Sequence, residues 1–118
     1  MARTLFLALA LLLLVDAAAA VRVLEPVERA VELTLDRLAL PAEGGNAVRF
    51  RECRSCASRS HRLLESTIFQ ASGQTLPLRE FRRVAHGIAA KANGAERAVV
   101  VVFLDIATQR VTRIELRE

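Results

Sequence analysis

The chain has 118 residues, a formal net charge of +4, 53% apolar residues, two cysteines and neither Trp nor Tyr. This composition excludes a multidomain enzyme, a disordered chain and a small protein held together mainly by disulfides. It fits one small folded domain with a single hydrophobic core.

The first twenty residues have the features of a secretory signal peptide. Arg3 supplies a positive charge, residues 5–15 are eleven consecutive apolar residues, and four alanines occupy 17–20. Eleven helical residues span only about 16 Å of a hydrocarbon core that is ~30 Å thick. The small residues that follow suit signal peptidase, so we expect cleavage after Ala20 and a periplasmic or secreted protein. The alternative is an uncleaved N-terminal anchor.

Cleavage leaves a short lead-in over residues 21–28 and a single domain over residues 29–118. The longest apolar run after the leader is residues 98–104, which is seven residues long. That length suits a buried strand, so we expect no transmembrane span in the mature protein.

The domain begins with a predicted strand. Residues 30–36 alternate polar and apolar side chains, and Leu38 and Leu40 continue the period before Pro41. The alternation favours a half-buried strand over the competing interpretation, a helix opened by Pro26.

Two more strands are predicted before the centre of the chain. Residues 42–46 form a turn whose two glycines are free to take positive φ, and residues 47–53 form the second strand. The polar residues 54–60 end it, and residues 62–71 form the third strand before a turn at 72–74. Neither face of that third strand is cleanly apolar, so its register is undecided.

An amphipathic helix is predicted over residues 77–92. Pro77 suits a first turn, Lys91 complements the dipole of the last turn, and Asn93-Gly94 supplies a left-handed stop. The apolar stripe follows spacings of three and four. Its members are Leu78, Phe81, Ala85, Ile88, Ala89 and Ala92.

The chain ends with a predicted hairpin. Residues 99–104 are apolar on both faces and indicate an interior strand, residues 105–109 form a turn, and residues 111–117 return as an alternating strand. The side chains expected to point inward are Thr112, Ile114 and Leu116. The predicted fold class is α+β, with an antiparallel sheet of about five strands in the order β-β-β-α-β-β and the helix on one face.

Cys53 and Cys56 form the one motif with chemistry of its own. In an exported protein, two cysteines at this spacing predict a structural disulfide that closes the end of the preceding strand. Because the closed loop has only four residues, the chain-entropy model limits its stabilisation to about 2 kcal/mol.

Thiol–disulfide exchange is the first alternative for this pair. The basic residues Arg51, Arg54 and Arg59 would lower the pKa of a nearby thiol. Exchange sites, however, place their first cysteine at a helix N-terminus, whereas Cys53 follows a strand.

Metal binding is the second alternative. Cys53, Cys56 and His61, which we place in a loop, with His86 as a fourth ligand, would make a zinc site. The cysteine pair alone would suit monovalent copper. Oxidation of the same two cysteines to a disulfide in an oxidising compartment argues against both the zinc site and the copper site.

The outer face of the helix is the best candidate for a binding surface. Arg79, Arg82, Arg83 and His86 follow the spacing i, i+3, i+4 and i+7 and form one basic strip. The strip suits an acidic envelope protein or an anionic lipid surface, although such faces are often merely solvated. Nucleic acid is excluded, because the compartment is wrong and no exposed aromatic accompanies the charges.

The sequence contains no catalytic constellation. Nothing positions a nucleophile and base, the carboxylates are scattered singly, and there is neither a Gly-rich phosphate loop nor a zinc-hydrolase motif. We therefore predict no cofactor and a non-catalytic structural or binding module. The alternative is a periplasmic protein that handles thiols or metal (zinc or copper) with its two cysteines.

Three segments and the cysteine pair together carry a family resemblance. These are Cys53-x-x-Cys56, Ser-Thr-Ile-Phe at 66–69, Thr-Leu-Pro-Leu-Arg-Glu-Phe at 75–81 and Val-Thr-Arg-Ile at 111–114. The chain resembles, over roughly residues 29–116, a group of small exported bacterial proteins of unknown function. Pro77 departs from the capping Ser or Thr expected there. The resemblance implies a fold and no substrate, cofactor or catalytic residue.

Overall fold

The computed structural model describes residues 27–117, so the predicted signal peptide and all but the end of the lead-in lie outside the described residues. The elements in chain order are β1 (Glu28–Thr34), the 3-10 turn η2 (Leu35–Arg37), β2 (Leu38–Ala39), β3 (Ala47–Phe50), β4 (Arg59–Ala71), β5 (Gln74–Leu76), α3 (Leu78–Ala89), α4 (Gly94–Arg97), β6 (Val99–Asp105) and β7 (Val111–Arg117).

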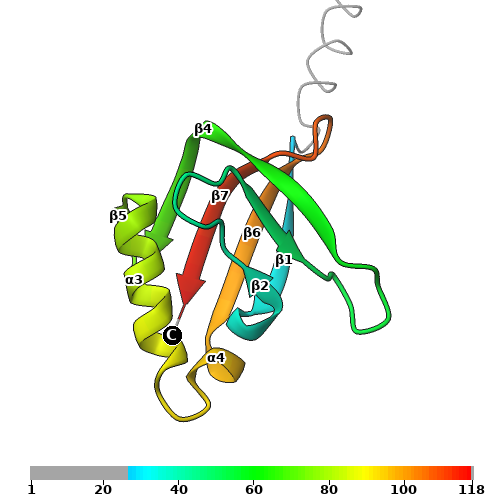
Figure 1. Cartoon of the computed structure of the whole chain (residues 1–118). Coiled ribbons are helices and arrows are strands. Elements are labelled where there is room, and N and C mark those ends of the chain that lie inside the picture. The colour runs from blue at the N-terminus through cyan, green and yellow to red at the C-terminus, as the bar shows by residue number, and fades with distance from the viewer. Residues whose placement is uncertain (1–26, 118) are drawn as a thin grey trace, which may run out of the picture.

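The strands of residues 27–117 form one mixed, seven-stranded sheet. Its order is β1-β6-β7-β4-β3-β2, with β5 paired to β4 off that path. Figure 1 shows β4 crossing from β7 to β3, which curls the sheet into a half-barrel, with α3 beside β4 and β5. The α+β class is confirmed, but the prediction of about five antiparallel strands in β-β-β-α-β-β order is wrong. The turn η2 splits the first predicted strand in two, β5 is additional, and β4 and β7 run parallel.

The strand β4 explains why the sequence left its register undecided. Its first residues, Arg59 to Arg62, pair with β3, whereas Ile68 to Ala71 pair with β7 and β5. The register shifts between these halves, and the hydroxyl of Thr67 bridges the irregularity. It accepts a hydrogen bond from the Leu64 N–H at 2.7 Å and donates one to the Val111 carbonyl at 2.6 Å. A strand that changes partners cannot present one apolar face throughout.

The helix α3 is shorter than predicted. It ends at Ala89, so Lys91 lies beyond its last turn, and both Ala89 and Ala92 are exposed rather than part of the apolar stripe. Asn93 takes the predicted left-handed conformation, with φ 59°.

Gly94 does not take a positive φ but opens the short helix α4. A Cβ at this position would collide with the backbone carbonyl of Ile88. The glycine is therefore required for the close approach of α4 to the end of α3, which the local sequence alone does not reveal. In the same way, only Gly44 of the predicted 42–46 turn has a positive φ.

The core lies between the sheet and α3. Phe81, Ala85 and Ile88 of the helix are buried, and the Phe81 ring lies 5.4 Å from that of Phe69 on β4. The strand β6 lies between β1 and β7, which confirms the predicted interior strand. Burying a ring of this size is worth about 1.5–3 kcal/mol, so the apolar stripe sets where α3 docks.

One inward position in β7 was predicted wrongly. Phe103 pairs with Arg113 and Leu104 with Val111, so Thr112 is the extra residue of an irregularity. Val111 takes the buried place expected for Thr112, while Ile114 and Leu116 are buried as predicted.

Candidate functional site

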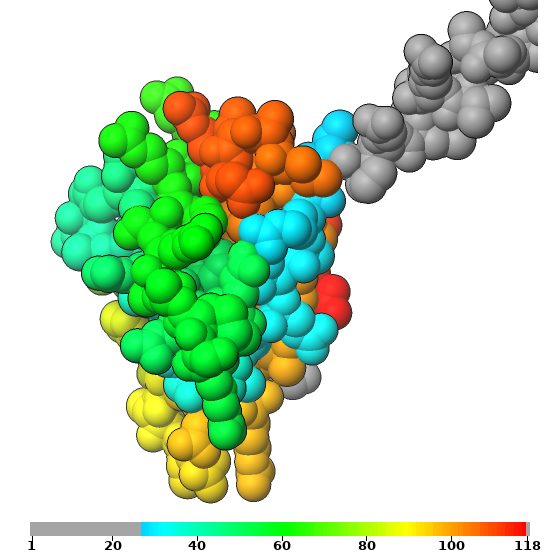
Figure 2. Space-filling model, turned by 90° about the vertical axis from the view of Figure 1, so that its right-hand side faces the viewer, coloured from blue at the N-terminus to red at the C-terminus, as the bar shows by residue number. Residues whose placement is uncertain are grey.

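A hollow of about 910 Å³ lies between β1, the β3–β4 connection, the start of β4 and the turn after β6. We call it the His61 hollow; the side chains used below are Arg29, Glu52, Cys56, Arg59, His61 and Gln109. In Figure 2 the green β3–β4 segment stands beside the cyan β1 and below the orange turn after β6. Residues far apart in the sequence thus share one face of the molecule.

His61 lies at the centre of this hollow. It belongs to β4, opposite Val48 of β3, so its predicted loop position is wrong. Its ring stacks on Phe50, with ring centroids 4.8 Å apart, and its Nδ1 lies 3.0 Å from the Gln109 carbonyl oxygen. A carbonyl only accepts, so Nδ1 donates. Within residues 27–117, Nε2 has no hydrogen-bond partner.

Arg29 connects three segments around the hollow. It forms an ion pair with Glu52 at 2.7 Å and donates a second hydrogen bond to the side-chain oxygen of Gln109 at 3.1 Å. Both partners of the ion pair are about two-fifths exposed, at 40% and 45%, and such surface pairs contribute only about 0–1 kcal/mol. The network therefore serves mainly to orient these side chains.

The turn after β6 presents Gln109 to the other residues of the hollow. Gln109 has φ 57°, in the left-handed region. The Asp105 carboxylate accepts hydrogen bonds from the Thr108 N–H at 2.8 Å and from its hydroxyl at 3.1 Å. These bonds lower the pKa of Asp105 below its ordinary value of 3.8. They confirm that Asp105 and Thr108 stabilise the predicted turn.

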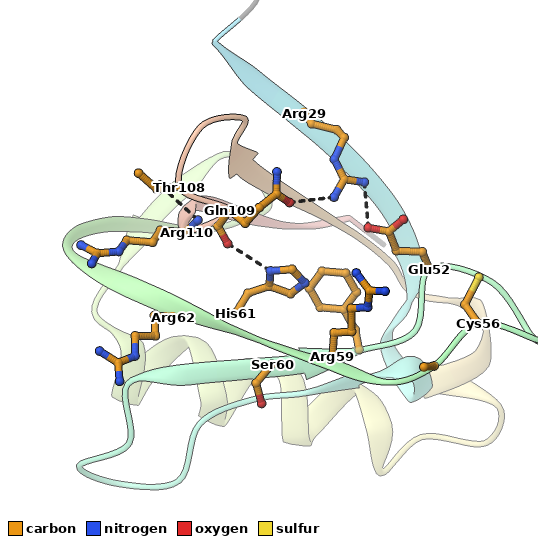
Figure 3. A pocket seen from close by; sticks show the side chains of 12 residues that line it. Arg29, Glu52, Cys56, Arg59, Ser60, His61, Arg62, Thr108, Gln109 and Arg110 are labelled. Atoms are coloured by element: carbon orange, nitrogen blue, oxygen red, sulfur yellow. Dashed lines mark hydrogen bonds and ion pairs between the residues drawn. The ribbon is translucent and has the colours of Figure 1, made fainter.

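Arg59, like Arg62 and Arg110 of the same lining, has no ion-pair partner in the part of the chain that the structure describes. Figure 3 shows it beside His61, whereas Ser60 and Arg62 point to the other side of β4. That alternation follows from the pleat of a strand. Because Glu52 neutralises Arg29, the lining keeps three uncompensated guanidinium groups, and that of Arg59 lies beside the His61 ring.

Cys53 and Cys56 are joined in a disulfide, with their Cα atoms 5.0 Å apart. The preceding strand β3 ends at Phe50, so the disulfide closes the β3–β4 connection rather than the end of the strand itself. The Cys56 N–H donates to the Cys53 carbonyl at 3.2 Å, and Cys56 lines the His61 hollow. Neither cysteine stands at a helix N-terminus, the position that thiol–disulfide exchange favours.

The other predicted sites lie apart. Among residues 27–117 no three His, Cys, Asp or Glu side chains are grouped so as to hold a metal ion, and His86 is on α3, away from His61. The basic strip Arg79, Arg82, Arg83 and His86 lies along α3; Arg82 is half-buried and the other three are exposed. Its acidic or lipid partner stays a prediction.

Sequence reasoning missed Arg29, Glu52 and Gln109 as neighbours. The Arg29–Glu52 and Arg29–Gln109 contacts span 23 and 80 residues. The one signal in the sequence for this site is the gathering of arginines over residues 49–62.

Comparisons with known proteins add no identification. No family model, no curated protein and no solved structure matches the chain. The resemblance to small exported bacterial proteins stays a prediction. Over residues 27–117, no helix is long and apolar enough to cross a bilayer.

Proposed function

We propose that the protein is an exported, non-catalytic binding module whose His61 hollow takes a small carboxylate ligand. The observation that carries this proposal is the guanidinium of Arg59, which has no ion-pair partner among residues 27–117 and lies in the hollow beside the His61 ring. A guanidinium matches a carboxylate with two parallel hydrogen bonds.

The same side chains favour binding over catalysis. His61 is oriented by a carbonyl oxygen instead of a carboxylate, Cys56 is in a disulfide, and the Ser60 hydroxyl is on the opposite side of β4. A nucleophile and its base would have to lie within hydrogen-bond reach of each other.

Arg59→Gln tests the proposal, with Arg97→Gln as the matched control. Arg97 is an exposed arginine on α4 that does not line the His61 hollow. We expect acetate, succinate or citrate to shift the NMR signals of the His61 ring in the wild type. Arg59→Gln should weaken that binding roughly tenfold or more, since hydrogen bonds to charged groups contribute about 1.5–3 kcal/mol. No shift with any of the three, or equal losses in both variants, would show the proposal to be wrong.

Thiol–disulfide chemistry is the second candidate, because Cys56 lines the same hollow beside Arg59. The reduction potential of the Cys53–Cys56 pair separates the two functions. A value below about −300 mV supports a structural cross-link, and a value near −120 to −200 mV supports exchange.

Export is tested on the cell-processed protein. N-terminal sequencing of the chain recovered from a periplasmic extract should begin at Val21. Recovery from the cytosol with residues 1–20 still attached would contradict export.

A further inference from the structure

A second hollow lies on the other side of the β3–β4 connection. It has a volume of about 560 Å³ and is bounded by η2, β2, the end of β3 and the disulfide loop. We call it the Arg49 hollow; its charged lining residues are Arg37, Arg49, Arg51, Arg54 and Asp36. Cys53 lines this hollow and Cys56 lines the His61 hollow, so the disulfide loop separates the two.

The arginines of the Arg49 hollow have no internal counter-charge. All four are exposed, and none forms an ion pair with another residue of 27–117. With Asp36 as the one lining carboxylate, the local formal charge is +3. Arg49 lies on β3, Arg51 directly follows the end of that strand, and both line the same hollow. Like charges gathered around one hollow repel, and an anion bound there would relieve the repulsion.

The excess charge selects the class of anion. A carboxylate offers one negative charge. A terminal phosphoryl group carries close to two negative charges and has three acceptor oxygens. Each guanidinium group can donate two parallel hydrogen bonds to such oxygens, and several guanidinium groups around one concave surface can bind the same phosphoryl group.

The disulfide constrains the backbone that carries one of the four cations. Arg54 lies inside the four-residue ring closed by Cys53 and Cys56, and a backbone hydrogen bond of 3.2 Å tightens the same ring. A ligand contact from a constrained loop loses less conformational entropy on binding than one from a free loop.

We propose that the Arg49 hollow is a binding site for a terminal phosphoryl group. The group is carried either by a soluble phosphate ester or by a lipid headgroup, since the binding chemistry of the two is the same. The site is separate from the His61 hollow and does not depend on the function proposed for it.

The test uses the cell-processed protein and two probes. Inorganic pyrophosphate is titrated calorimetrically, and phosphatidylcholine vesicles containing phosphatidic acid are tested by co-sedimentation. The variant is Arg49→Gln with Arg51→Gln. Its matched control is Arg97→Gln with Arg117→Gln, which removes the same charge from exposed positions outside both hollows.

We expect the wild type to bind at least one probe. The Arg49/Arg51 variant should bind that probe with an affinity at least tenfold lower, and the affinity of the control should change less than twofold. Binding of pyrophosphate alone identifies a soluble ester, and binding of vesicles alone identifies a headgroup. Binding of neither probe overturns the proposal, as does an equal loss in the control, which would indicate net charge alone. If Arg59→Gln, and not the Arg49/Arg51 variant, removes pyrophosphate binding, phosphate enters the His61 hollow and the proposal is wrong.

Discussion

Replacing both cysteines of the disulfide by serine should destabilise the fold by a calculable amount. The bond between Cys53 and Cys56 closes a loop of four residues. For that loop length the chain-entropy model gives about 2 kcal/mol. In a domain of 60–100 residues each kcal/mol shifts Tm by roughly 4–8 °C, so the double variant should melt about 8–16 °C lower.

Thermal and urea unfolding should be followed by far-UV circular dichroism, because the chain has no Trp or Tyr to report by fluorescence. Reduced wild-type protein should have the same Tm as the serine variant, since both lack the same cross-link. The variant should also bind pyrophosphate more weakly than the Arg97/Arg117 control, because Arg54 is no longer held in the ring. A Tm within 2 °C of the oxidised wild type, or unchanged pyrophosphate affinity, would refute the reasoning that the disulfide constrains this loop.

Three further predictions follow from local geometry. Gly94→Ala should destabilise the protein, because the added Cβ would collide with backbone atoms. Gly87→Ala, in the exposed last turn of α3, places its Cβ in open space and should stabilise the protein by about 0.5–1 kcal/mol. Urea midpoints that move in the same direction for both variants would contradict this. Thr67→Val removes a hydroxyl that makes two hydrogen bonds and should lower the free energy of unfolding by about 2 kcal/mol. The control Ser60→Ala should lower it by less than about 0.5 kcal/mol. Equal losses would mean that Thr67 does not stabilise the irregularity of β4. Because folding lowers the pKa of Asp105, its charge stabilises the fold above the unfolded pKa, and that contribution is lost as pH falls through the folded pKa. The Tm difference between wild type and Asp105→Asn should therefore shrink between pH 7 and pH 3. A constant difference would contradict the lowered pKa.

Elements with a strong local pattern were predictable. The apolar run of β6, the stripe of Phe81, Ala85 and Ile88 on α3, and the turn at Asp105 all rest on residues close together in the chain. Periodicity reports such features because one face of a helix or strand repeats within a few residues.

Features that depend on contact between distant segments were not predictable. The parallel pairing of β4 with β7 decides which face of each half of β4 is buried, and no window along β4 contains that information. The length of α3 is set where α4 folds back onto the carbonyl of Ile88, so a helix-forming sequence over residues 90–92 does not continue it.

The amino-acid sequence determined the α+β class, the positions of α3 and β6, and the pairing of Cys53 with Cys56. Tertiary structure alone decided that Arg29, Glu52, His61 and Gln109 meet across the curled sheet, and that the arginines near Arg49 line a hollow of their own. The physical reason is range. Backbone preferences and side-chain periodicity act over a few residues, whereas a binding site is formed by long-range packing that brings charges from separate strands to one surface.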